Sequence, residues 1–79
     1  MSTIADRVMD VAAAILNVPR ESLTAQSSPS DVESWDSMQH LQIILALEEA
    51  FGLKFAAHEI DKMQSIGAMT AALEGRQAS

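Results

Sequence analysis

Apolar residues recur at helical spacing in three stretches of this chain. The first stretch predicts a helix over about residues 3–17. Its apolar face consists of Ile4, Val8, Val11, Ile15 and Leu16. Thr3 can cap the start of this helix, and Asp6 stands three residues later, which is close to a capping box. The helix should end near Asn17, because the residue before Pro19 avoids the helical conformation.

The clearest helical signal covers about residues 37–51. Asp36 can cap this helix, Gln39 can reach back to the cap, and Gly52 is typical of a helix end. At 100° per residue its apolar side chains form two stripes. The first stripe contains Ile43, Ile44, Leu47 and Phe51, and the second contains Met38, Leu41 and Leu45. Since one stripe is enough to join a small core, we favour a partly exposed second stripe over a fully buried helix.

The rest of the chain predicts two further helices and one long connection. A short helix is expected over about residues 57–62, and a last helix, capped by Ser65, over about residues 65–75. Residues 18–36 read as a loop with two prolines. Its expected anchors in the core are Leu23, Val32 and Trp35. The pattern therefore predicts an all-α fold, a small four-helix bundle of three main helices and one short helix, in a single domain over residues 1–79.

The composition excludes several classes of protein. A chain of 79 residues with 48% hydrophobic residues can build one compact core but not two. Because it has no cysteine, it offers no disulfide, thiolate metal site or thiol nucleophile. The longest apolar run, at 43–47, is too short to cross a bilayer, and the N-terminus lacks the regions of a signal peptide. We expect a cytoplasmic monomer that does not enter the membrane.

The acidic residues are concentrated in one part of the chain. The formal net charge is −6, and seven of the 11 acidic residues, but only one of the five basic ones, lie between positions 31 and 61. This balance opposes nucleic-acid binding, which depends on neutralising phosphates. The acidic segment is either a solvated face that keeps the protein in solution or a docking surface for basic partners.

Ser37 is the residue best placed to carry chemistry. It opens a helix directly after the capping Asp36, where backbone N–H groups and the helix dipole favour a phosphate ester. Alternatively, Ser37 only starts the helix. A Ser37–His40–Asp36 hydrolase is not expected, because the adjacent Asp36 and Ser37 cannot bracket His40 in a relay.

No metal site is expected from the acidic and histidine residues. His58 and its acidic neighbours lack the ligand spacing of zinc sites. The acidic residues of the long loop, in turn, do not follow the calcium-loop pattern.

These motifs resemble the acyl carrier proteins and related phosphopantetheine-carrying domains. The resemblance covers nearly the whole chain and rests on Asp36-Ser37-Met38 followed, at the right distance, by the segment Leu47-Glu48-Glu49-Ala50-Phe51-Gly52-Leu53. It implies that Ser37 receives a 4′-phosphopantetheine arm from coenzyme A through a separate magnesium-dependent phosphopantetheinyl transferase, which Asp36 helps to engage. The thiol of the arm would carry acyl groups as thioesters, so that the chain is a carrier without catalytic activity of its own.

The resemblance also implies a docking surface for acyl-loading and acyl-processing enzymes. The expected surface consists of Met38, Leu41, Leu45, Glu48 and Glu49. Basic partners would be steered by the acids and discriminated by the apolar stripe. Reversing the charge of Glu48 or Glu49 is expected to slow association with little loss of stability.

Two departures from the fatty-acid-synthesis members point to a specialised pathway. Glu33-Ser34-Trp35 stands where those members have a glycine-containing stretch. The neutral residues Gln39, His40 and Gln42 stand where those members tend to be acidic. We favour polyketide, nonribosomal peptide or other specialised biosynthesis, with an acyl or aminoacyl cargo. The alternatives are a housekeeping fatty-acid carrier and an unmodified helical adaptor.

Overall fold

The computed structural model describes residues 3–78, and all regular structure in this range is helical. The predicted all-α fold with four helices is confirmed. The helices are α1 (Ile4–Leu16), α2 (Ser37–Phe51), α3 (Ala57–Lys62) and α4 (Ile66–Ala78). The last helix continues past residue 75, where the sequence placed its end. The connection between α1 and α2 also contains an unexpected 3₁₀ turn, η1 (Arg20–Ser22).

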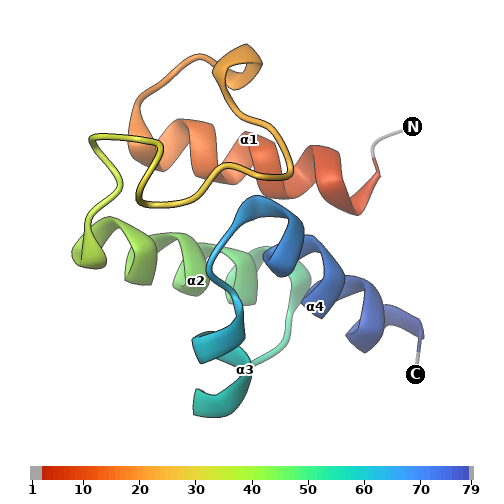
Figure 1. Ribbon diagram of the computed structural model, residues 1–79. Coiled ribbons are helices and arrows are strands. Elements are labelled where there is room, and N and C mark those ends of the chain that lie inside the picture. Colours follow the sequence, from red (N-terminus) through yellow and green to blue (C-terminus); the bar gives the residue numbers. More distant parts are fainter. Residues whose placement is uncertain (1–2, 79) are drawn as a thin grey trace.

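The helices form a small bundle in which α1 packs between the two other long helices. α1 packs against both α2 and α4, and α3 packs against α4. Figure 1 shows α1 and α2 running in opposite directions, with the long connection arching over α1 before it reaches the start of α2. Within residues 3–78 no helix has both the length and the apolar character needed to cross a membrane.

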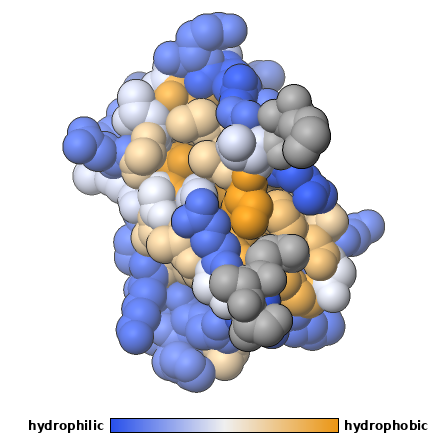
Figure 2. All heavy atoms as spheres, turned by 90° about the vertical axis from the view of Figure 1, so that its right-hand side faces the viewer, coloured by the Kyte–Doolittle hydropathy of each residue, from blue (hydrophilic) through white to orange (hydrophobic). Residues whose placement is uncertain are grey.

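The core lies where α1, α2 and α4 meet. The three longest helices contribute Val8, Ala12, Leu16, Ile43, Ile44, Leu47, Ile66, Met69 and Leu73, all of which are buried. Each large apolar side chain removed from water stabilises the fold by about 1.5–3 kcal/mol before the entropy of folding is counted. Figure 2 views the side of the molecule where α1 begins and α4 ends, and it shows apolar residues (orange) exposed between hydrophilic ones (blue).

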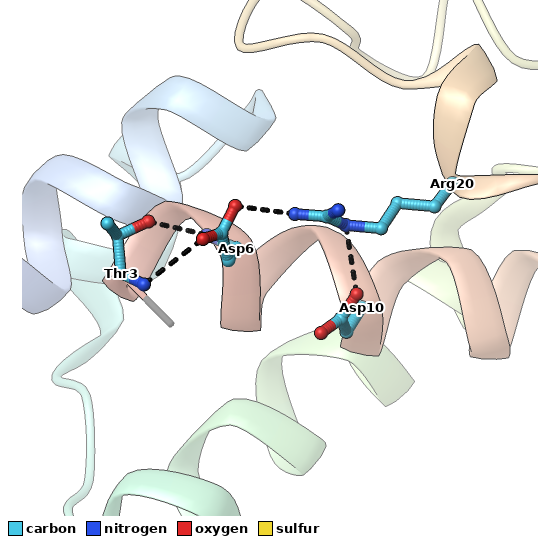
Figure 3. A network of polar contacts seen from close by, with 4 residues as sticks. All are labelled: Thr3, Asp6, Asp10 and Arg20. Carbon is cyan, nitrogen blue, oxygen red and sulfur yellow. Dashed lines mark hydrogen bonds and ion pairs between the residues drawn. The ribbon is translucent and has the colours of Figure 1, made fainter. Parts of the chain in front are cut away.

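The cap that the sequence predicted forms at the start of α1. The Thr3 hydroxyl accepts from the Asp6 N–H at 3.1 Å and the Asp6 carboxylate accepts from the Thr3 N–H at 3.2 Å, which confirms a capping box. Arg20 reaches from η1 to the carboxylates of Asp6 and Asp10 (Figure 3). The hydrogen bonds from Thr3 and Arg20 lower the pKa of Asp6. Arg20 therefore fastens the long connection to α1. At the other end of α1, Asn17 adopts the left-handed conformation that ends the helix.

The long connection is also tied to the start of α4. Carbonyl oxygens of Ser27 and Ala25 accept from the N–H groups of Ile66 and Gly67 at 3.0 and 2.7 Å. These are N–H groups of the first turn of α4, which have no partner inside the helix. Gly67 permits the contact, because a Cβ atom there would lie 2.9 Å from the Ala25 oxygen. Each of the three expected loop anchors packs on the core, with Leu23 and Trp35 buried and Val32 partly buried.

Candidate functional site

Ser37 is exposed at the first position of α2. The preceding Asp36 is the N-cap, and its carboxylate accepts from the Gln39 N–H at 2.9 Å. The N–H groups of Ser37 and Met38 have no acceptor among residues 3–78. The Ser37 hydroxyl thus lies beside two unused backbone donors at the positive end of a four-turn helix, a setting that favours an anionic phosphate ester.

Only half of the expected capping box forms at this helix. Gln39 does not reach back to the N-cap, because the Asp36 N–H donates instead to the Ser34 carbonyl at 3.2 Å. The side-chain oxygen of Gln39 is buried and has no hydrogen-bond partner among the described residues. The reciprocal contact predicted from the Asp-to-Gln spacing is therefore wrong. The chain turns tightly before Ser37, so the N–H of the N-cap residue Asp36 already has an acceptor in the Ser34 carbonyl.

His40 forms a pair with Trp35, the last residue of the loop before the cap. The indole N–H of Trp35 donates to His40 Nδ1 at 3.0 Å, and the two rings stack with centroids 5.8 Å apart. Since Nδ1 accepts, neutral His40 bears its proton on Nε2, which is buried and makes no hydrogen bond of good geometry among residues 3–78. Burial lowers the pKa of His40, whereas the nearby Met63 carbonyl raises it. The Nδ1 atom that a Ser37–His40–Asp36 relay would need is bound to Trp35, in keeping with the expectation that no relay exists.

A cleft of about 470 Å³ opens beside Ser37. Its walls come from the long loop, the start of α2 and the connection between α3 and α4, and they consist of Pro29, Trp35, Asp36, Ser37, His40 and Gln64. The sequence analysis did not anticipate that Pro29 and Gln64 contribute to this site. Both are distant from Ser37 in sequence, and no local pattern marks them.

The two apolar stripes of α2 separate as the sequence predicted. Ile43, Ile44 and Leu47 are buried, and Phe51 is partly buried beneath the guanidinium of Arg7, 4.1 Å from the ring centre. In the second stripe the side chains are open to solvent, with exposed fractions of 69% for Met38 and 54% for both Leu41 and Leu45. We refer to Met38, Leu41 and Leu45 as the docking stripe.

The two acidic residues near the end of α2 differ in their surroundings. One oxygen of Glu48 accepts from the backbone N–H of Phe55 at 2.8 Å, and Phe55 is itself buried. Glu49 is exposed. Both line a groove of about 480 Å³ together with Leu45, Gly52, Leu53 and Lys54. Charge reversal at Glu48 was expected to cost little stability; because its bond to the Phe55 N–H holds the segment that leads to α3, the structure predicts a larger loss at Glu48 than at Glu49.

Comparison with known proteins identifies the family. The family model described as the phosphopantetheine attachment site matches residues 6–73. The chain therefore belongs to this family of carrier domains, and 4′-phosphopantetheine is the prosthetic group of the family, as the motifs around Ser37 implied. Among residues 3–78 no cluster of three or more histidine or acidic residues is arranged to hold a metal ion.

Individual relatives are acyl carrier proteins. The chain is 32% identical over 65 residues to mitochondrial acyl carrier protein 2 of Arabidopsis thaliana, which covers 82% of this chain and 52% of that protein. The chain thus spans about half the length of that relative. Because the relative is mitochondrial, the cytoplasmic location expected from the sequence stays a prediction.

Solved structures of two holo acyl carrier proteins share the fold. The protein from Nitrosomonas europaea superposes with a TM-score of 0.82 at 25% identity, with both chains covered completely. The protein from Geobacter metallireducens superposes with a TM-score of 0.83 at 27% identity, covering 99% of this chain and 88% of the other.

Proposed function

We propose that Ser37 bears the 4′-phosphopantetheine arm and that the chain presents acyl or aminoacyl thioesters on this arm to partner enzymes. The observation that supports the proposal best is the exposed Ser37 hydroxyl at the capped start of α2, next to the unused N–H groups of Ser37 and Met38. An attached phosphodiester would retain one negative charge at this helix end, which the helix dipole stabilises by about 0.3–1 kcal/mol.

The modification is a phosphoryl transfer from coenzyme A. The Ser37 oxygen loses its proton and forms a bond to the phosphorus nearest the pantetheine. The bridging P–O bond breaks, and adenosine 3′,5′-bisphosphate leaves. The base and the magnesium ion belong to the phosphopantetheinyl transferase, and Asp36 contributes from this chain by holding the first turn of α2 in a form that the transferase can engage. The thiol of the arm supplies the thioester chemistry that a chain without cysteine lacks.

The docking stripe and Glu49 form the surface that partner enzymes contact in this proposal. Three large apolar side chains more than half exposed along one helix would be costly without a partner to cover them. Glu49 is exposed beside Leu45 at the end of the stripe and attracts basic residues. Glu48 contributes charge to this surface while one of its oxygens stays bound to Phe55.

The pathway we propose is polyketide, nonribosomal peptide or another specialised acyl biosynthesis. The support lies in the neutral residues around the first turns of α2. Gln39 and His40 are partly buried there and His40 is bound to Trp35, so this part of the surface has little acidic character for partners to recognise. A housekeeping fatty-acid carrier is the competing assignment.

The decisive experiment is intact-protein mass spectrometry after incubation with coenzyme A, magnesium and a promiscuous phosphopantetheinyl transferase. Wild-type protein should gain the mass of one phosphopantetheinyl group, and Ser37→Ala should gain none. Ser30→Ala is a matched control, because Ser30 is exposed in the loop and should leave the gain intact. A folded wild type without a gain would refute the carrier function and favour an unmodified adaptor that binds through the docking stripe.

A further inference from the structure

Ser37 stands on the border between two different surfaces of α2. At 100° per residue, His40 lies about 60° to one side of Ser37 and Leu41 about 40° to the other. On the side of His40 is the cleft described above, and on the side of Leu41 is the exposed docking stripe. A group attached to Ser37 can therefore turn into the cleft or lie along the stripe.

The cleft is a concave site assembled from three segments. Pro29 and Trp35 come from the long loop, Ser37 and His40 from α2, and Gln64 from the connection between α3 and α4. The Trp35 indole is held in place by its hydrogen bond to His40 and by the stacking of the two rings. The docking stripe, by contrast, offers separate side chains on a convex helix surface. A flexible group gains more contact in the cleft than on the stripe.

The walls of the cleft suit the chemistry of the arm next to its phosphate. That part of 4′-phosphopantetheine has a carbon with two methyl groups, then a hydroxyl, then an amide. Pro29 and the ring of His40, both partly exposed, provide apolar surface, and the Trp35 indole adds only the small part of its ring that its 2% exposure leaves accessible. The side-chain nitrogen of Gln64 donates to the Asp61 carbonyl at 3.0 Å, which leaves the side-chain oxygen of Gln64 as an acceptor.

We propose that the cleft is the resting site of the arm, which packs its methyl groups on Pro29, Trp35 and His40 and donates an amide N–H to Gln64. This inference rests on attachment at Ser37 and goes beyond it. With the arm in the cleft, the docking stripe stays uncovered. A partner enzyme can therefore bind Met38, Leu41 and Leu45 before the arm leaves the cleft to present its cargo.

The test uses holo protein labelled with ¹³C and ¹⁵N and an unlabelled arm, after mass spectrometry has shown that the arm is attached. Isotope-filtered nuclear Overhauser spectra should show cross-peaks from the arm methyl groups to ring protons of Trp35 and His40. Gln64→Ala should weaken or abolish these cross-peaks. The matched control Gln42→Ala, an exposed glutamine of α2 that does not line the cleft, should retain them.

The outcomes separate this proposal from the attachment itself. Cross-peaks from the arm to Met38 and Leu41, or no cross-peaks to the protein at all, would overturn the resting site while leaving attachment at Ser37 intact. Identical cross-peaks to the cleft in Gln64→Ala and Gln42→Ala would refute the proposed donation of the amide N–H to Gln64. A wild type that gains no mass would instead refute attachment at Ser37, and the resting site with it.

Discussion

Glu48 and Glu49 are adjacent in sequence, yet the structure predicts that only the removal of Glu48 lowers stability appreciably. Glu48 accepts a charge-assisted hydrogen bond from the Phe55 N–H at 2.8 Å, and Phe55 is only 8% exposed. Removing the carboxylate leaves that N–H without its acceptor, close to the core. Bonds to charged groups contribute about 1.5–3 kcal/mol, and part-exposure of Glu48 lowers the expected loss for Glu48→Ala to about 1–2 kcal/mol.

The measurement is urea unfolding followed by far-ultraviolet circular dichroism, supported by thermal melts. For a domain of this size each kcal/mol shifts the melting temperature by about 4–8 °C, so Glu48→Ala should melt about 10 °C lower than wild type. Glu48→Gln keeps a neutral acceptor and should recover roughly half of the loss, since charged hydrogen bonds are about twice as strong. Glu49→Ala should change the free energy of unfolding by less than about 0.5 kcal/mol.

Unfolding of Glu48→Ala and Glu49→Ala at the same urea concentration would contradict this prediction. The Phe55 bond would then contribute nothing in solution, and Glu48 would be only a surface charge. A glutamine variant less stable than the alanine variant would also contradict the reasoning, because it would show that acceptance by the side chain is not what stabilises this turn.

Two further predictions concern the loop contacts and the pH dependence of folding. Gly67→Ala should lower stability by about 1–3 kcal/mol, because its Cβ would lie 2.9 Å from the Ala25 oxygen, whereas Gly75→Ala, with nothing within 4 Å, should be neutral or stabilising by about 0.5–1 kcal/mol in urea unfolding. A harmless Gly67→Ala would mean that the loop does not approach α4 so closely. Burial holds the pKa of His40 in the folded state below its ordinary value of 6.5, so the stability that neutral His40 contributes is present above pH 6.5 and is lost as the pH falls from there towards the folded-state pKa. The stability difference between wild type and His40→Gln should therefore shrink on acidification, and a difference that grows would show that His40 is charged in the native state.

Local sequence signals explain why the helices begin and end where they do. Thr3 with Asp6 caps α1, Asp36 caps α2, and Gly52 ends α2 in the left-handed conformation with φ 65°. Such signals involve residues within about four positions of each other, so they can be recognised in the sequence before the fold is known. The return contact expected of Gln39 was wrong, because a tight turn brings the Ser34 carbonyl to the Asp36 N–H instead.

The proposed attachment site could be predicted from the sequence, whereas the residues around it could not. Ser37 and the docking stripe follow from a motif and a helical period, and the structure places that serine and those side chains in the open. Glu48 also appeared in the motif, but only as a surface charge. Its bond to Phe55 depends on how the chain turns after Gly52, and no spacing rule encodes that turn.

The helices, the exposed stripe of α2 and the position of Ser37 could be predicted from the amino-acid order, because each depends on residues close together in the chain. The residues that surround Ser37 became known only from the packed fold. Pro29 and Gln64 meet there because the loop is fastened to α1 by Arg20 and to α4 through the close approach at Gly67. Contacts between segments far apart in sequence are set by the packing of the whole core, which makes the cleft a property of the fold rather than of any motif.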